Sequence, residues 1–325
     1  MYFHHRRQLA TSTLLLAAML AGCGGGSGDS GTSGAGLSGN GGGTVITVPV
    51  EANAPTLSGN IALDGVNWIN YRRNMLGLST LTRNNIIDRA AQSHSDYQRS
   101  NNTVTHDQVS GRPGFTGVTL ANRLTAVGYT LSQPPGWAVG EVISAATNNS
   151  GFYHAEELIT AIYHRFVLFE PVFREIGTGA ATTSNNYTYF TADLATNTGL
   201  GAGLGLGRIA IYPVNSQTGI PTNFFSDNES PDPVPNQNEV GYPISVHADS
   251  GPNGDLTVQS FTVAPRGGAT LSTRLLSHAT DSATPEKVAA IVPLAPLRAN
   301  TTYDVSFRGA VHGVTVARDW SFTTR

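Results

Sequence analysis

The feature of this sequence that most constrains its fold is a change of hydrophobic periodicity near residue 208. After that point the chain consists of short β-like runs, such as "RIAIYPV" and "TTYDVSFRG", separated by Pro, Gly, Asn and Asp. Before it, apolar residues recur at helical spacing. The best example is "NNIIDRAAQSHSDYQRS", whose i, i+3, i+4, i+7, i+10 stripe is Ile87, Ala90, Ala91, His94 and Tyr97. The pattern therefore predicts two modules, one mainly helical and one all-β.

The helical module spans residues 63–198 and is expected to have an α+β fold. Helical spacing predicts helices over 63–78, 84–100, 119–129 and 154–169, the last one ending before Pro171. The alternating stretch "YTYFTADLA", residues 187–195, predicts a strand. A few helices packed on a small sheet satisfy this order of elements.

The β module spans residues 208–325. Its regularly spaced short strands predict a β-sandwich. The closing stretch "TTYDVSFRGAVHGVTVARDWSFTT" resembles the last strands of bacterial Ig-like domains, which makes Tyr303 and Trp320 core residues. Residues 199–207, "GLGAGLGLG", have glycine at every second position, and a strand rather than a helix is expected after them, so they are interpreted as a glycine-rich connector.

The N-terminus has the organisation of an export signal. A basic "HHRR" precedes the short apolar run "LATSTLLLAAML", which is too short for a mature membrane span. The following "LAGC" resembles the lipobox of bacterial lipoproteins, which implies a signal peptide over 1–22 and lipidation of Cys23. Because Gly24 stands where an aspartate marks inner-membrane retention in many lipoproteins, outer-membrane anchoring is favoured over inner. Residues 23–62 are rich in Gly and Ser and predict a flexible tether.

Composition excludes some partners and crosslinks. Charged residues make up 13% of the chain, the formal net charge is −3, and no basic stripe is present, so nucleic acid is not an expected partner. With Cys23 as the single cysteine, no intrachain disulfide can form.

Several motifs of the helical module occur in a recognisable order. These are "NWINYRRNMLGL", "AAQSHSDYQRS", "VTH", "GEVI" and "YHRFVLFEPVFREIGTG". Together they resemble the CAP superfamily, also called the SCP or PR1-like fold, in its bacterial form. The resemblance implies an α-β-α sandwich with a cleft lined by histidines and acidic residues, in a domain followed here by the Ig-like domain.

The family pattern places the cleft residues at defined positions. "VTH" places the first histidine at His106, "VGE" places the first glutamate at Glu141, and "YHR" places the second histidine at His164. On this interpretation His164 and Arg165 interrupt an apolar helix because one face of the helix borders the cleft. This sequence has "IYHR" where bacterial relatives commonly have "SPGHR", so the loop before His164 departs from the pattern.

A fourth cleft residue is less defined. Glu157 lies seven residues before His164, which places it on the same face of the expected helix and about 10 Å along its axis. We therefore choose Glu157 over its neighbour Glu156. Bacterial members of the family often lack the second glutamate, and this alternative remains open.

Two interpretations of the cleft remain open. Two imidazoles and a carboxylate match the ligands of Zn²⁺ or another divalent cation, here His106 and His164 with Glu141. Alternatively, the same side chains form a hydrogen-bonded polar network without a metal.

Other polar residues have ordinary explanations. His94 is expected to be a satisfied core or supporting histidine, and His154 to face solvent at a helix start. Salt bridges or capping explain Arg72 and Arg123. Tyr153 and Tyr163 either line the cleft or pack in the core, and nothing is assigned to His247, His278 and His312.

Two functions follow from these expectations. The first is a lipid-anchored, exported binding module for a small apolar ligand, a peptide or another cell-envelope component. The alternative is a metal-assisted hydrolase, peptidase-like, that uses Glu141 as base with His106 and His164. The sequence has no HExxH, GxSxG or P-loop motif, which favours the binding module over an enzyme.

Overall fold

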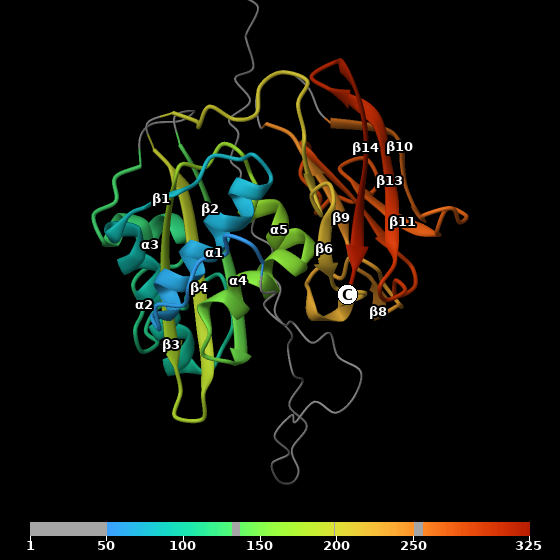
Figure 1. Cartoon of the computed structure of the whole chain (residues 1–325). Helices are drawn as coiled ribbons and strands as arrows, with labels where there is room; N and C mark the ends of the chain where they lie inside the picture. Colours follow the sequence, from blue (N-terminus) through green and yellow to red (C-terminus); the bar gives the residue numbers. More distant parts are fainter. Residues whose placement is uncertain (1–50, 132–136, 198, 250–255) are drawn as a thin grey trace, which may run out of the picture.

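The computed structural model describes residues 51–131, 137–197, 199–249 and 256–325 (Figure 1). The expected signal peptide over 1–22, Cys23 and most of the expected tether lie outside the described residues. Within the part that is described, no helix is long and apolar enough to cross a membrane.

The helical module is built around a four-stranded sheet with the strand order β1-β3-β4-β2. β1 runs parallel to β3 and the other neighbours are antiparallel. β1 and β2 are the edge strands. Helices α2 and α3 cover one face of the sheet, and α1, α4 and α5 cover the other (Figure 1). The elements are α1 Ile61–Met75, β1 Thr82–Arg83, α2 Asn85–Asn101, α3 Leu120–Ala126, β2 Ala138–Thr147, α4 Gly151–Thr160, α5 Ile162–Leu168, β3 Glu175–Thr182 and β4 Tyr187–Thr196.

Two glycines bring α2 unusually close to this sheet. A Cβ atom at Gly177 would lie 2.2 Å from the backbone nitrogen of Asp88, and one at Gly179 would lie 2.3 Å from Cα of Gln92. Side chains at these two positions would therefore push the helix away from β3. This explains the "IGTG" spacing in the sequence, since only glycine leaves the helix in contact with the strand.

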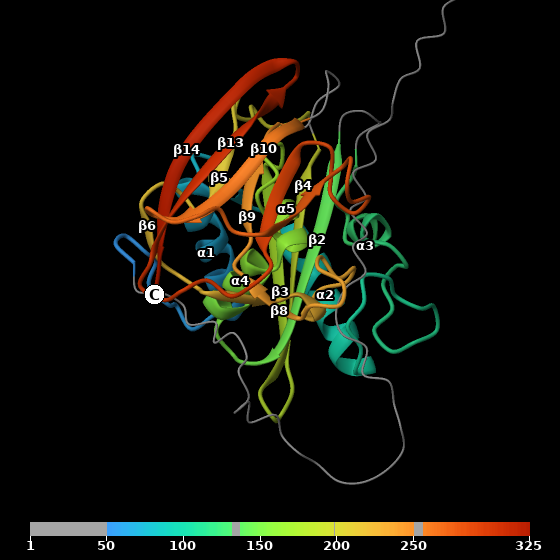
Figure 2. The same cartoon turned by 90° about the vertical axis from the view of Figure 1, so that its right-hand side faces the viewer.

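The β module contains two four-stranded sheets, with the orders β10-β13-β14-β6 and β11-β12-β9-β5, and a ribbon of β7 and β8. Figure 2 shows β10, β13 and β14 side by side in the first of these sheets. Tyr303 and Trp320 are buried, which confirms their prediction as core residues. The elements are β5 Ala210–Tyr212, β6 Gln217–Ile220, β7 Asn223–Phe225, the short 3₁₀ helix η1 Ser226–Asn228, β8 Glu239–Gly241, β9 Ile244–His247, β10 Leu256–Pro265, β11 Thr273–Ser277, β12 Val288–Pro293, β13 Thr302–Val311 and β14 Val314–Thr324.

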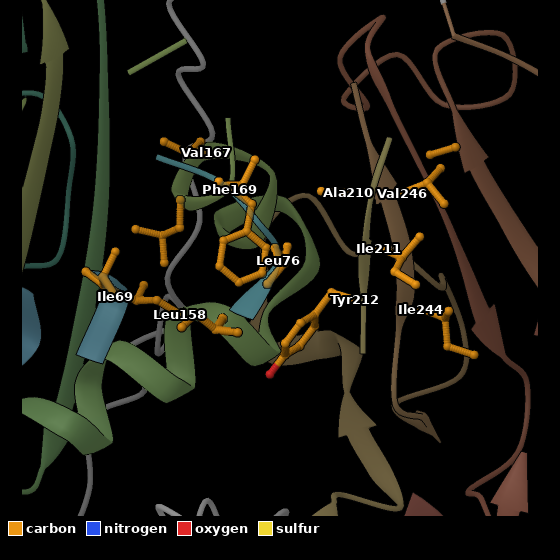
Figure 3. Close-up of a cluster of buried hydrophobic side chains, with 14 of the residues drawn as sticks. Ile69, Leu76, Leu158, Val167, Phe169, Ala210, Ile211, Tyr212, Ile244 and Val246 are labelled. Atoms are coloured by element: carbon orange, nitrogen blue, oxygen red, sulfur yellow. The ribbon is translucent and has the colours of Figure 1, made fainter. Parts of the chain in front are cut away.

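The two modules share one continuous hydrophobic core. α4 and α5 lie between the sheet of the helical module and the strands of the β module (Figure 1). A second apolar cluster joins Ile162 and Phe166 of α5 to Phe224 and Val240 of the β7–β8 ribbon. Figure 3 shows side chains of both modules in the main cluster, among them Ile69, Leu158 and Phe169 from the helices, and Ile211, Tyr212 and Val246 from the strands.

The single helix predicted over 154–169 is wrong. The structure has two helices, α4 and α5, separated at Ala161, whose φ of −69° and ψ of 121° are those of extended backbone. The break leaves the last carbonyls of α4 without a partner inside a continuing helix. Arg165 donates to two of them, at 2.5 Å to the oxygen of Ile159 and 3.3 Å to that of Thr160. The helical periodicity missed the break because both segments are apolar and nearly continuous.

Candidate functional site

The pleat of β2 decides which of the expected cleft residues can meet. Val139 packs with Ile87 and Leu124 of α2 and α3, whereas Val142 belongs to the main core cluster on the other side. Glu141 shares the parity of Val139 and therefore faces α2 and α3, whereas Ser144 faces α4. The sheet thus divides the polar residues of this region into two groups.

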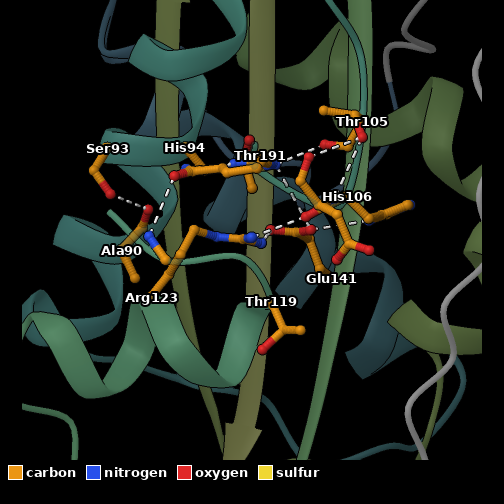
Figure 4. Close-up of polar contacts among 12 residues, drawn as sticks. Ala90, Ser93, His94, Thr105, His106, Thr119, Arg123, Glu141 and Thr191 are labelled. Atoms are coloured by element: carbon orange, nitrogen blue, oxygen red, sulfur yellow. Dashed lines mark hydrogen bonds and ion pairs between the residues drawn. The ribbon is translucent and has the colours of Figure 1, made fainter. Parts of the chain in front are cut away.

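The first group is centred on Glu141 and lies under α2 and α3 (Figure 4). Oε1 of Glu141 accepts a hydrogen bond from Nδ1 of His106 at 2.9 Å, and its Oε2 accepts one from Nη2 of Arg123 at 2.6 Å. Arg123 also donates from Nη1 to the carbonyl of His106 at 2.8 Å and to that of Val118 at 3.2 Å. Arg123 therefore holds both the carboxylate and the loop that carries His106, so the structure brings His106 and Glu141 together.

His94 supports this loop from α2. Its Nε2 donates to the carbonyl of Thr105 at 2.7 Å, and its Nδ1 accepts from the Gln108 amide at 3.0 Å. The Gln108 amide is itself oriented, because its oxygen accepts from the backbone N–H of Thr116 at 2.7 Å. Burial, together with the positive charge of Arg123, lowers the pKa of His94 to about 4, so it is neutral at physiological pH. The expectation that His94 is a satisfied supporting histidine is confirmed.

A second acid, which the sequence analysis did not single out, lies directly opposite Glu141. Asp193 on β4 is its cross-strand partner, is fully buried, and receives no N–H or O–H donor from the described residues. Burial and the nearby charge of Glu141 raise the pKa of Asp193 well above its usual range. Burial also raises the pKa of Glu141. His94, Arg123 and His106 outweigh this effect and hold the pKa of Glu141 well below its usual range. Glu141 is therefore the ionised member of the pair and Asp193 the protonated one.

The second group contains Glu157 and lies on the other face of the sheet. Ser144 contacts the carboxyl of Glu157, and its hydroxyl lies 2.7 Å from Nδ1 of His154. Nε2 of His154 donates to the carbonyl of Asn148 at 3.1 Å. The Ser144 hydroxyl donates to the carboxyl of Glu157, and burial raises the pKa of Glu157 against the effect of this hydrogen bond. His154 is fully buried, so the expectation that it faces solvent is wrong.

His164 does not join His106 and Glu141 in one ligand cluster. Its Nδ1 donates to Glu229 of the β module at 2.8 Å, and its side chain is buried at the boundary between the modules. Glu157 and His164 also stand on different helices, so the expected spacing along one helix is wrong.

Glu156 forms an ion pair with Arg72 at 3.0 Å and accepts from the Trp68 indole at 2.7 Å, which confirms the salt-bridge explanation of Arg72.

His164 and Arg165 interrupt the apolar helix α5 because both contact the β module, and not because the helix borders an open cleft. The guanidinium of Arg165 packs against the rings of both Tyr212 and Tyr242, 4.9 and 5.0 Å from their centroids, and donates to the carbonyl of Pro243 at 2.7 Å. The Tyr163 hydroxyl likewise donates to Asp281 of the β module at 2.9 Å. Arg165 therefore joins the end of α4 to the β module.

The arrangement of His106, His164 and Glu141 does not fit the divalent cation that their side-chain types suggested. Among the described residues, no group of three or more His, Cys, Asp or Glu side chains is placed to hold a metal ion. Both oxygens of Glu141 already accept hydrogen bonds, and the Arg123 guanidinium at 2.6 Å would repel a second cation there. The polar network, the second of the two interpretations, is the one that these contacts support.

Comparison with known families supports the resemblance on which these expectations rest. Residues 66–194 match the model of CAP, the cysteine-rich secretory protein family. This segment of the chain is therefore a CAP domain, and the strands that follow it form a separate β module. The comparison with curated proteins found no match.

Solved structures show distant similarity to about two fifths of the chain. An extracellular protein containing an SCP domain from Bacillus anthracis is 20% identical, with a TM-score of 0.36, over 42% of this chain and 40% of its own. An outer surface protein from Borrelia burgdorferi is 16% identical, with a TM-score of 0.34, over 41% of this chain and 90% of its own. Venom allergen-like protein 4 from Schistosoma mansoni is 9% identical, with a TM-score of 0.29, over 44% of this chain and 90% of its own. This chain thus spans less than half the length of the Bacillus protein.

Proposed function

We propose that this protein is an exported, lipid-anchored binding module whose CAP domain engages a ligand at His106. The observation that carries the proposal is the difference in exposure within the Glu141 network. The side chain of His106 is 14% exposed, whereas those of Glu141 and Arg123 are 4% and 0% exposed. His106 is thus the solvent-reachable end of a fixed network, and its Nδ1 is held by Glu141, which leaves Nε2 to meet a ligand.

The surroundings of His106 favour a ligand with an apolar part, such as a small lipid-like molecule or a peptide of the cell envelope. Val109 and Val118 are 56% and 43% exposed. Both belong to the loop that follows His106. The backbone N–H of Gln108 donates to the Val118 carbonyl at 2.9 Å and so joins the start of this loop to its end. Exposed valines beside a partly exposed imidazole offer apolar contact and one polar anchor.

The binding proposal is tested with the mature chain purified from membranes. We would measure binding of total envelope lipids and of soluble cell-wall peptides to the parent chain, to His106→Gln and to His278→Gln, a control at an exposed histidine of the β module. Binding of one probe should be lost in His106→Gln and retained in the control. Equal binding by all three proteins, or no binding by the parent, would remove the proposal's support.

The anchor is proposed from Cys23 and the motif before it. Metabolic labelling with a fatty acid should label the parent chain and not Cys23→Ala, and the label should fractionate with the outer membrane. Labelling of Cys23→Ala would show that another residue carries the lipid, and fractionation with the inner membrane would contradict the role given to Gly24.

We also propose that the β module is Ig-like. In that fold strands A, B, E and D form one sheet, and C, F and G form the other. With β5 as A, β9 as B, β10 as C, β11 as D, β12 as E, β13 as F and β14 as G, the two observed sheet orders follow this arrangement, with β6 as an additional strand parallel to β14. The β module would then act as a rigid extension of the CAP domain, because the two modules share a core.

A further inference from the structure

The break between α4 and α5 leaves the first turn of α5 without a capping side chain of its own. Ala161 occupies the N-cap position, and its methyl group cannot accept a hydrogen bond. The first N–H groups of a helix have no partner inside the helix, and buried N–H groups without a partner are costly. Ile162, Tyr163 and His164 are all buried, so these N–H groups cannot turn to bulk water.

Glu229 of the β module supplies the missing acceptor. Its Oε2 accepts from the backbone N–H of Ile162 at 2.9 Å. Its Oε1 accepts from the N–H of Tyr163 at 2.7 Å and from that of His164 at 3.1 Å. The same oxygen accepts from Nδ1 of His164 at 2.8 Å. One carboxylate, 65 or more residues distant in the chain, therefore receives four hydrogen bonds from the start of α5.

The β module holds Glu229 in a defined position. The residue follows η1, and its backbone N–H donates to the carbonyl of Ser226 at 3.0 Å. Ser226 is tied to the loop before β8, since its hydroxyl donates to the Gln237 carbonyl at 2.9 Å and its N–H to that of Asn238 at 2.8 Å. Glu229 is 2% exposed, so its charge is compensated by the α5 donors and not by solvent.

We propose that Glu229 is a positioning residue of the CAP domain, supplied by the β module, which caps α5 and fixes the tautomer of His164. A carboxylate oxygen only accepts, so Nδ1 of His164 carries a hydrogen. Nε2 of this imidazole is buried and has no partner among the described residues, which leaves it as a directed acceptor. The second histidine of the CAP motif is therefore oriented by the other module. This inference goes beyond ligand binding at His106 and does not depend on it.

The test uses the full chain labelled with ¹⁵N. In the unmodified protein, the nitrogen shifts and proton couplings of the His164 ring should show a hydrogen on Nδ1. A hydrogen on Nε2 alone would overturn the proposal without any variant. This measurement keeps the proposal falsifiable even where a substitution impairs folding.

The variants are Glu229→Gln and, as a matched control, Asp227→Asn, which changes an exposed acid two residues earlier in η1. In Glu229→Gln, hydrogen exchange at the amides of 162–164 should accelerate at least about tenfold, since hydrogen bonds to a charged acceptor are lost. The His164 ring shifts should change with it. Asp227→Asn should leave both the amide exchange at 162–164 and the His164 ring shifts unchanged. Unchanged exchange and ring shifts in Glu229→Gln, or faster exchange throughout the chain with an unchanged His164 ring, would overturn the proposal.

Discussion

Replacing Arg123 tests whether the Glu141 network has the energetics that its burial implies. Arg123 is fully buried and its guanidinium is the closest positive group to Glu141, at 2.6 Å. Arg123→Met keeps the length of the side chain and removes the charge. Removing one partner of a buried ion pair leaves an uncompensated buried charge, which typically costs about 3–5 kcal/mol. The carbonyls of His106 and Val118 lose a donor in the same step.

The assay is urea unfolding of the full chain, followed by tryptophan fluorescence. Arg308→Met is the matched control, because Arg308 pairs with Asp319 at 2.8 Å on the surface, and it should leave the unfolding midpoint unchanged. The double variant Arg123→Met/Glu141→Gln removes both charges, so its loss should be smaller than the sum of the two single losses. A loss below about 1 kcal/mol for Arg123→Met, or strict additivity in the double variant, would refute the assignment of Glu141 as a buried ion held by Arg123.

Three further outcomes follow from the same structure. The raised pKa of Asp193 means that folding takes up a proton, so this group favours folding below its unfolded pKa of about 3.9 and loses that contribution as pH rises toward the folded value. Asp193→Asn should therefore gain stability relative to the parent between pH 4 and pH 7 in urea titrations, and a difference independent of pH would contradict this. Gly179→Ala, whose Cβ would lie 2.3 Å from Cα of Gln92, should lower the unfolding free energy by about 1–3 kcal/mol, and an unchanged midpoint would contradict the close approach of α2. Adding a chelator should leave the thermal midpoint unchanged because both oxygens of Glu141 are already held, whereas a lower midpoint would show a bound metal.

The CAP domain could be predicted from sequence because its signals are local. The helical stripe that contains Ile87 and Tyr97 formed α2, and the order of the motifs matched the family over 66–194. The family resemblance placed His106 and Glu141 in one cleft, and the structure joins them by a hydrogen bond of 2.9 Å. The β-like runs after residue 208 likewise became two sheets.

The position of His164 could not be predicted in the same way. It depends on a backbone break at Ala161 that no periodicity marks, and on which face of the sheet each helix covers. Its partner Glu229 lies in "SDNESPDPV", a stretch with no helical or strand pattern. Asp193 was missed for a related reason, because its relation to Glu141 exists only through the pairing of β2 with β4.

The sequence alone determined the two kinds of module, the CAP-type motifs and the residue types available for a polar site, because each of these follows from residue spacing along the chain. Only the tertiary structure decided that Glu141 and Glu157 face opposite sides of one sheet, and that His164 and Arg165 meet the β module. The physical reason is that strand pairing and the packing of one module on another fix which buried polar groups share a space, and each such group takes the nearest partner able to satisfy it.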